Sequence, residues 1–285
     1  MTKQIEYHCP VISVAALDAP RADGSHTQKM ITFHCPPIAE TARPGQFVAL
    51  SCAQFLRRPL GIARVDRVEG TVSVGGRAKG EGMADLLELR PDDTVSVLGP
   101  LGHGFELENL DSCIVAGGGT GVYPMLFLLD ELRARGVKTG AAFGFRDKAN
   151  SVLVDEFQAV SDVCVVASEA GDMDVEGDIL AAITLVARRL DFVADENGAR
   201  LGDGISRGGA VLTCGPTPMM RAVAEFAKTN GLSCQVSLEE RMACGVGLCL
   251  VCACKTKDPS QSTGWRYTRC CKEGPVYDAE EVVWQ

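Results

Sequence analysis

The sequence lacks an apolar run long enough to cross a membrane, since a membrane-spanning helix needs roughly 20 apolar residues in a row. The run that comes nearest, residues 113–129, is interrupted by several glycines and by Pro124. The first residues, Met1-Thr-Lys-Gln-Ile-Glu, also lack the apolar core of a secretory signal. We therefore expect a cytoplasmic protein with no membrane span, in which cysteines stay reduced.

Positive charge and histidine are scarce as well. The 285 residues include 28 Lys and Arg against 37 Asp and Glu, so the formal net charge is -9. Nonspecific nucleic-acid binding needs an excess of positive charge, and we expect no nucleic-acid partner. The histidines His8, His26, His34 and His103 all lie before residue 109. With none near Cys214, a Cys–His catalytic pair is not expected, and we assign no catalytic residue.

Cysteine, in contrast, is abundant, and its spacing is the most informative feature of the chain. Cys244, Cys249 and Cys252 lie in one short stretch, and a fourth cysteine, Cys270 or Cys271, follows about 18 residues later. The spacing C-x4-C-x2-C with a distant fourth cysteine is that of plant-type [2Fe–2S] clusters. Intervening glycines at 245 and 247 suit a loop that turns tightly round an inorganic core.

These cysteines could also bind structural zinc or form disulfides. Structural zinc also binds four thiolates, but its ligands usually come as two C-x2-4-C pairs, whereas here three cysteines share one loop. A disulfide framework fits poorly with an odd total of 13 cysteines and no secretory signal. The remaining nine are expected to be small apolar residues: Cys9, Cys35, Cys52, Cys113, Cys164, Cys214, Cys234, Cys254 and one of the pair Cys270 and Cys271.

The chain divides into three segments by its pattern of apolar residues. Residues 1–108 carry short runs typical of strands, at 7–14, 29–33, 46–50, 71–74 and 94–97, separated by turn residues. This rhythm predicts a small antiparallel β-barrel, with one short helix at 83–89.

Residues 109–232 change character, because strands now alternate with helices. Strands are predicted at 112–116, 139–145, 163–168 and 209–214, and helices at 124–135, 153–159, 178–188 and 218–229. Alternation of this kind predicts a Rossmann-like parallel sheet covered on both faces. The polar stretch 191–207 is expected to be a loop insertion. Residues 233–285 are too few for a large core, so a bound cluster would help this segment to fold.

Several glycine-rich stretches suit phosphate binding. Residues 117–121 join a buried strand to a helix, and Cys214-Gly215-Pro216 lies where another strand ends. The strict G-x-G-x-x-G pattern is absent, so a tight turn without ligand remains an alternative. In the first segment, Arg57 and Arg58 precede a proline and could bind phosphate or simply end a solvated edge strand.

Taken in order, these motifs resemble the ferredoxin–NADP reductase superfamily along the whole chain. The stretches 237–252 and 271–278 are more specific, and resemble the electron-transfer subunits of two-subunit, NAD-linked dihydroorotate dehydrogenases. The resemblance implies a multidomain β plus α/β fold: a flavin-binding barrel at 1–108, an NAD-binding domain at 109–232 and a small [2Fe–2S] domain at 233–285.

The resemblance also implies site residues. The cluster ligands would be Cys244, Cys249, Cys252 and Cys271, the last because the Gly-Pro-Val at 274–276 follows it at the family's distance. FAD would contact Arg58, Pro59, Leu60, Gly61, Gly75, Gly76, Arg77, Gly82 and Met83, and NAD(H) would contact Gly117, Gly118, Gly119, Thr120, Gly121, Cys214, Gly215 and Pro216. Relatives usually carry a hydroxyl residue where Gly61 and Met83 stand, which removes two hydrogen-bonding groups from the expected flavin site.

The implied activity is electron transfer in pyrimidine biosynthesis. Electrons would pass between NAD(H), FAD and the cluster, to or from an FMN-containing catalytic subunit that binds dihydroorotate, the two chains forming a heterotetramer. One alternative is a related subunit of a sulfide dehydrogenase or a ferredoxin-linked transhydrogenase, where an aspartate often replaces one cluster cysteine. An oxygenase reductase would need a longer, separate ferredoxin domain. A different class, a zinc-stabilised binding module without redox function, is motivated by Gly61 and Met83.

Overall fold

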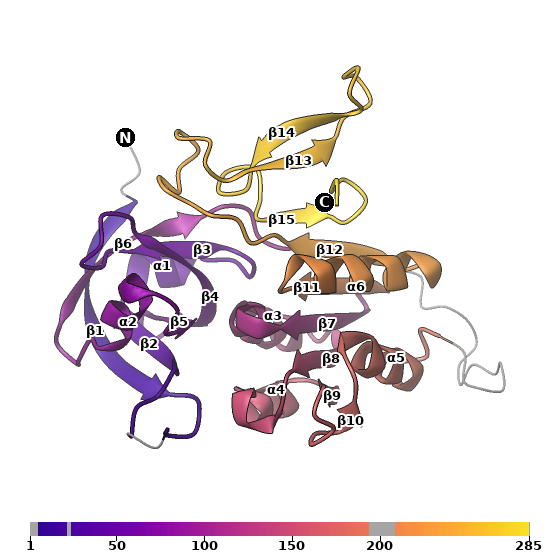
Figure 1. Cartoon of the computed structure of the whole chain (residues 1–285), viewed down its shortest axis with the longest axis horizontal. Coiled ribbons are helices and arrows are strands. Elements are labelled where there is room, and N and C mark those ends of the chain that lie inside the picture. Colours follow the sequence, from indigo (N-terminus) through magenta and orange to yellow (C-terminus); the bar gives the residue numbers. More distant parts are fainter. Residues whose placement is uncertain (1–4, 22–23, 194–208, 285) are drawn as a thin grey trace. The chain divides into compact units, whose positions relative to one another are not determined.

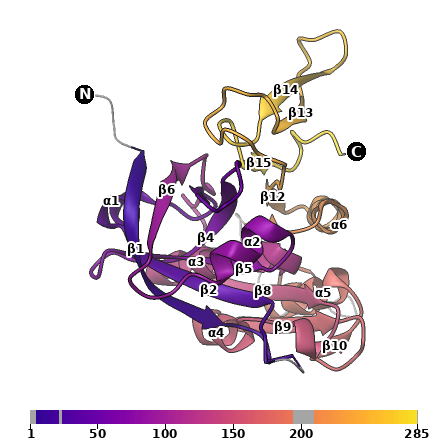
Figure 2. The same ribbon diagram turned by 60° about the vertical axis from the view of Figure 1, so that its left-hand side comes forward.

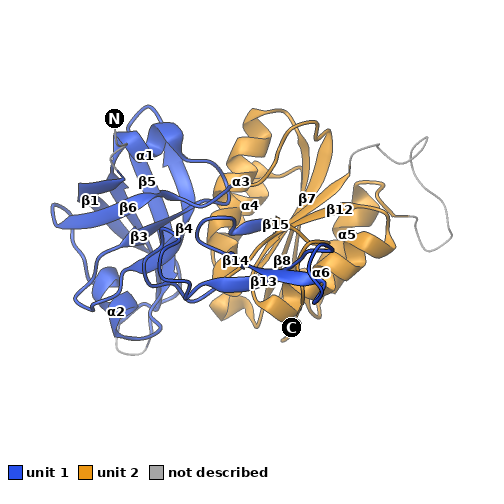
Figure 3. Cartoon of the chain, turned by 90° about the horizontal axis from the view of Figure 1, so that it is seen from above, with its two compact units in different colours: residues 1–104, 240–276 blue, residues 105–239, 277–285 orange. Residues whose placement is uncertain are grey.

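The computed structural model describes residues 5–21, 24–193 and 209–284 of the chain. Two compact units emerge, and the chain passes between them more than once (Figure 3). Unit 1 combines residues 1–104 with 240–276, and unit 2 combines 105–239 with 277–285. The predicted boundary at 232/233 falls directly before a strand of unit 2, so the division into three domains stays a prediction.

Six strands of unit 1 close into the predicted barrel, in the order β1-β2-β5-β4-β3-β6 (Figure 2). Neighbouring strands in the barrel pair antiparallel throughout. Short helices α1 (Pro36–Thr41) and α2 (Glu81–Leu87) accompany the barrel. The strands are β1 (Glu6–Ala16), β2 (Gln28–His34), β3 (Phe47–Leu50), β4 (Arg58–Asp66), β5 (Thr71–Arg77) and β6 (Thr94–Leu101).

Strand β4 and helix α1 were not predicted from the sequence. Pro59 and Gly61 obscure β4, because both residues are rare inside strands. The structure nevertheless pairs Pro59 with Ala49 and Gly61 with Phe47 of β3. A register shift between Ile62 and Arg64 then adapts β4 to its other neighbour, β5.

Unit 2 contains a seven-stranded sheet flanked by helices (Figure 1). All residues of β7 and β11 are buried, which explains their continuous apolar runs. From β10 through to β12, neighbouring strands pair parallel, as predicted. In spatial order the strands are β10 (Val175–Glu176), β9 (Val163–Ser168), β8 (Lys138–Phe145), β7 (Ser112–Gly118), β11 (Ala210–Cys214), β12 (Ser233–Ser237) and β15 (Val276–Asp278).

Four helices cover this sheet, with α3 and α4 in mutual contact and α5 and α6 likewise. They are α3 (Val122–Ala134), α4 (Val154–Val160), α5 (Ile179–Arg189) and α6 (Thr217–Thr229), each within two residues of its predicted ends. The first strand in sequence, β7, lies between β8 and β11, so the strand order reverses direction at the β7–β11 pair. Most of the predicted loop insertion at 191–207 lies outside the described residues.

The cysteine-rich segment of unit 1 consists of a loop followed by a two-stranded ribbon, β13 (Ala253–Lys257) and β14 (Trp265–Arg269). Gly245, Gly247 and Leu250 adopt positive φ angles of 69°, 84° and 62°, so the chain reverses sharply within the loop. No helix in the described part of the chain has the length and apolar content of a membrane span.

Candidate functional site

The loop that begins at Cys244 brings two predicted ligands together. The backbone N–H of Cys249 donates to Cys244 Sγ at 3.4 Å, and that of Cys244 donates to Cys249 Sγ at 3.5 Å. Leu248 N–H adds a third donor, 3.3 Å from Cys244 Sγ. Burial opposes ionisation of Cys244, but the backbone donors outweigh it and lower the pKa of this thiol to about 6.

The other two predicted ligands form a second pair, more deeply buried than the first. Cys271 N–H donates to Cys252 Sγ at 3.4 Å, and both residues are 2% exposed, whereas Cys249 is exposed. Burial, together with the neighbouring Cys252, raises the pKa of Cys271 to about 12. The negative charge of Cys244 contributes to the raised pKa of Cys271 as well.

The neighbouring Cys270 has different surroundings. It is fully buried, and burial followed by the charge of Cys254 raises the pKa of its thiol. Its backbone N–H donates to the carbonyl of Cys252 rather than to a sulfur. The backbone N–H of Cys271 thus donates to a predicted ligand sulfur, whereas that of Cys270 donates to a carbonyl; the assignment of Cys271 as ligand stays a prediction.

Two pairs of thiols suit a dinuclear cluster better than a single metal ion. In a [2Fe–2S] cluster each iron takes two protein ligands, whereas structural zinc needs four donors round one centre. The donor set and its division into pairs therefore fit the cluster.

The predicted flavin residues of the barrel come together from β4, β5 and α2. A Cβ placed on Gly82 would lie 2.3 Å from Arg58 Nε, so the guanidinium occupies the space over this glycine. A Cβ on Gly76 would lie 2.3 Å from the Met83 methyl, which fills the corresponding space on β5. Nothing lies within 4 Å of a Cβ on Gly80, the residue before α2. The guanidinium of Arg58, close to uncovered backbone at Gly80, therefore suits the binding of a diphosphate.

The two arginines that precede Pro59 have separate roles. Arg57 is bound within the barrel: it donates to the Ser96 carbonyl at 3.0 Å and pairs with Glu6 at 2.6 Å. Arg58 has no ion-pair partner within the described part of the chain. It is half-buried, as are Pro59, Leu60 and Gly61, while Gly75 is buried and Arg77 is exposed. The structure therefore leaves Arg58 as the arginine available to a ligand.

One row of residues runs across the barrel from the predicted flavin strand to the cysteine loop. Gly61 of β4 pairs with Phe47 of β3, and Phe47 pairs with Leu101 of β6. Leu101 Cδ1 then lies 3.4 Å from a Cβ placed on Gly245. Since neighbouring strands are roughly 5 Å apart, this row spans about 10 Å before it reaches the loop.

The cysteine segment is also tied to the end of β6 by its backbone. His103 N–H donates to the Gly274 carbonyl at 2.6 Å, and a Cβ on Gly102 would lie 2.5 Å from Pro275. Together with the approach of Leu101 to Gly245, these contacts fix both ends of the cysteine segment to the barrel, because Gly245 precedes the β13–β14 ribbon in the sequence and Gly274 follows it.

In unit 2, the two predicted glycine turns lie side by side at the carboxyl ends of β7 and β11. A Cβ on Gly121 would lie 2.5 Å from the carbonyl carbon and oxygen of Cys214 and from Gly215 N. The sheet reverses its strand order here, and parallel sheets bind ligands at such a switch point. Both turns therefore lie where a parallel sheet can bind a ligand, and their contact with NAD(H) stays a prediction.

The exposed members of these turns are Gly119, Thr120 and Pro216, while Gly117, Gly118 and Gly121 are buried. Cys214 is 3% exposed, and burial raises the pKa of its thiol. Its side chain is therefore a buried apolar group, and only the backbone that follows it reaches the end of the sheet.

Sequence reasoning missed two groups of residues at these sites. Met219 of α6 covers the second turn, because a Cβ on Gly118 or Gly215 would lie within 2.7 Å of its side chain. Arg269 and Glu273 form an ion pair beside the cysteine loop, and hydrogen bonds from Arg269 lower the pKa of Glu273 to about 2. The spacing of four residues between opposite charges was the available signal.

Comparison with known proteins gives concordant results. The family described as the iron–sulfur cluster binding domain of dihydroorotate dehydrogenase B matches residues 239–283, which include all four predicted ligands. Similar over most of the chain is the electron transfer subunit of dihydroorotate dehydrogenase B (NAD(+)) from Bacillus caldolyticus, 38% identical over 253 residues (86% of this chain, 89% of that protein). The subunit of the same name from Caldanaerobacter subterraneus subsp. tengcongensis is 34% identical over 84% of this chain and 87% of its own length.

Solved structures agree on the fold. An NADH-dependent reduced ferredoxin–NADP oxidoreductase covers all of this chain and 92% of its own, with a TM-score of 0.78 and 25% identity. A ferredoxin–NADP⁺ reductase from Neisseria gonorrhoeae with bound FAD and NADP has a TM-score of 0.61 over 80% of this chain and 93% of its own; at 14% identity it supports the fold alone.

Proposed function

The chain belongs to the family of electron-transfer subunits of NAD-linked dihydroorotate dehydrogenase B, and we propose that it passes electrons between NAD(H), FAD and a [2Fe–2S] cluster. We propose further that the electrons go to or come from an FMN-containing catalytic subunit in a heterotetramer. When bound, the flavin exchanges two electrons with NAD(H) and single electrons with the cluster.

One observation carries this proposal: the row Gly61–Phe47–Leu101 leads from the predicted flavin strand to the cysteine loop. A flavin on β4 and a cluster in that loop would then be held by one unit of the protein, separated by about two strand spacings. The protein's task in such a relay is to bind and orient the carriers, which supply the chemistry themselves.

The chain's own residues have defined tasks in the proposal. Arg58 would bind the diphosphate of FAD, and Gly82, which has no side chain, makes room for the Arg58 guanidinium. The close approach of Gly121 to Cys214 would shape the floor of the nucleotide site. Backbone N–H groups in the cysteine loop would stabilise thiolate at Cys244, the form that binds iron.

The exposed side of the cysteine loop suits a protein partner. Leu248, Leu250 and Val251 are 82%, 63% and 53% exposed, and they flank the exposed Cys249. Apolar side chains so close to an electron carrier fit a surface that a catalytic subunit covers. None of the thirteen cysteines, all within the described residues, is in a disulfide, which suits the cytoplasm.

The test is an absorption spectrum of the anaerobically purified chain, before and after NADH, with iron and flavin quantified. We expect flavin and about two irons per chain, both bleached by NADH, and co-elution with a co-expressed catalytic subunit. A colourless protein with zinc would refute the redox assignment, and an intact relay that never binds the catalytic subunit would refute the partner.

A ferredoxin-linked transhydrogenase subunit is the second candidate, favoured by the similarity to the NADH-dependent reduced ferredoxin–NADP oxidoreductase. Relatives of that kind often replace a cluster cysteine by aspartate, whereas all four positions here are cysteine. Reduction of ferredoxin by the isolated chain, without dihydroorotate oxidation in the complex, would favour this second candidate.

A further inference from the structure

We propose that Arg269, held by Glu273, is a positioning residue that sets the reduction potential of the cluster. The inference rests on the proposed [2Fe–2S] site and deepens it. It concerns a side chain that lies outside the ligand set and contacts the ligand loop from the end of β14.

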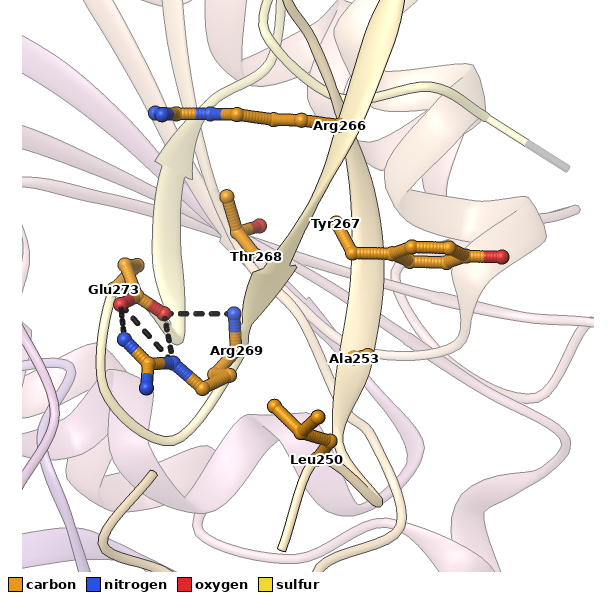
Figure 4. Close-up of a pocket in the computed structure, with 7 residues that line it drawn as sticks. All are labelled: Leu250, Ala253, Arg266, Tyr267, Thr268, Arg269 and Glu273. Atoms are coloured by element: carbon orange, nitrogen blue, oxygen red, sulfur yellow. Dashed lines mark hydrogen bonds and ion pairs between the residues drawn. The ribbon is translucent and has the colours of Figure 1, made fainter. Parts of the chain in front are cut away.

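The ion pair that holds Arg269 is geometrically well defined. Arg269 Nε lies 3.0 Å from Glu273 Oε2 and 3.2 Å from Oε1, and Nη2 also contacts Oε1. The backbone N–H of Arg269 donates to Glu273 Oε2 at 2.7 Å, which fixes the carboxylate from a second direction. Figure 4 shows the two side chains turned toward each other at one end of a pocket of about 540 Å³.

From this position Arg269 reaches across to the cysteine loop. Its Nη1 donates to the Gly247 carbonyl at 2.9 Å. Gly247 has a φ of 84°, and a Cβ on it would lie 2.8 Å from Lys272 Cδ, so the loop passes close to the chain that follows β14. Arg269 thus joins the segment of the first two predicted ligands to the segment of the fourth.

The hydrogen bond to Gly247 also orients a donor to sulfur. The Gly247 carbonyl and the Leu248 N–H belong to one planar peptide unit and point in opposite directions. While Arg269 binds the carbonyl, the N–H on the other side lies 3.3 Å from Cys244 Sγ. Hydrogen bonds to the sulfurs are among the main determinants of a cluster's potential.

The positive charge of Arg269 affects the reduction potential of the cluster in the same direction as this hydrogen bond to sulfur. Its guanidinium interacts electrostatically with Cys271 and Cys252, the more buried pair of predicted ligands. Reduction adds one negative charge to the cluster, and a nearby positive charge or N–H donor stabilises that state. Both effects of Arg269 therefore raise the reduction potential, whereas the carboxylate of Glu273 lowers it.

The experiment is a potentiometric titration of the full-length, cluster-loaded chain, followed by the electron paramagnetic resonance signal of the reduced cluster. We expect Arg269→Gln to lower the reduced-to-oxidised ratio at a given potential about tenfold, a shift of 59 mV for one electron. Glu273→Gln should shift the potential upward, and Arg269→Lys should restore part of the loss. Arg266→Gln is the matched control, since Arg266 lies on the same strand and lines the same pocket, away from the ion pair.

The possible results separate cleanly. If Arg269→Gln and Arg266→Gln both retain the wild-type potential with a full cluster, the inference is wrong. If Arg269→Gln assembles no cluster, the other two variants test the inference: the potential should rise in Glu273→Gln and fall in Arg269→Lys. If neither shift is found, the inference is wrong. A wild-type chain that binds no iron would instead refute the proposed function.

Discussion

Replacing Gly121 by alanine should weaken NADH binding through steric contact alone. Gly121 has φ −67° and ψ −11°, a conformation that alanine adopts freely, so the substitution adds no backbone strain. The new methyl would lie 2.5 Å from Cys214 C, Cys214 O and Gly215 N, whereas real Cβ atoms essentially never come within 3.0 Å of such atoms. One of the two turns must therefore move by about half an ångström or more.

The size of the effect follows from that displacement. Overpacking of this kind costs about 1–3 kcal/mol of folding free energy, and a misplacement approaching 1 Å at a site lowers function about 100-fold. We expect the dissociation constant for NADH, measured by stopped-flow reduction of the flavin, to rise about 10- to 100-fold. Flavin and iron content should not change, because the residues predicted to bind them belong to the other unit.

A matched control is available on the neighbouring strand. Gly144 of β8 pairs with Gly118, but a Cβ on it meets only ordinary contacts, the nearest at 3.5 Å from Ile179 N. Gly144→Ala should therefore bind NADH within about twofold of wild type. Wild-type NADH affinity in Gly121→Ala, with the variant folded, would refute the placement of the nucleotide at the switch point.

Further predictions concern the cluster and stability. Cys271→Ser should lose most bound iron while Cys270→Ser keeps it, as measured by iron content and visible absorption; equal losses would contradict the ligand assignment. Thr213→Val should leave the unfolding free energy unchanged or raise it by about 1 kcal/mol in chemical denaturation, because the buried hydroxyl has no hydrogen-bond partner among the described residues. Burial opposes ionisation of Asp18, but hydrogen bonds from Thr27 and a backbone N–H lower its pKa below 3.8. Asp18→Asn should therefore cost about 1–2 kcal/mol at pH 7, and the difference from wild type should vanish as the pH falls through that lowered value. A constant difference down to acid pH would show that the charge of Asp18 is not responsible.

Prediction from the sequence succeeded best where a local pattern of apolar residues determined a single helix or strand. The helices of unit 2 have clear apolar periodicity, and the strand 163–168 was predicted with its exact ends. Strand β4 was missed because Pro59 and Gly61 oppose a strand locally, and only pairing with β3 and β5 overrides them. The pairings of β13 and β15 depend on contacts distant in sequence, which periodicity does not reveal.

The candidate sites show the same contrast. The cysteine spacing predicted three ligands and left the fourth open between Cys270 and Cys271, because cluster geometry imposes a strict local pattern. It did not reveal Arg269, whose importance comes from a hydrogen bond to Gly247, 22 residues away. The contact between Gly121 and Cys214 was equally invisible, since it depends on β7 and β11 being neighbours in the sheet.

The path of the chain makes iron loading part of the folding of unit 2. β12 and β15 belong to the same sheet of unit 2, yet residues 240–276 between them belong to unit 1. A cluster joining Cys244 to Cys271 would shorten that loop roughly threefold and lower its closure entropy by about 1 kcal/mol. Without iron, β15 and its Ala279–Cys234 backbone hydrogen bond should open first, leaving β12 as a bare edge. Iron shortage would then expose the apoprotein to aggregation and proteolysis, so that the amount of intact subunit follows the iron supply.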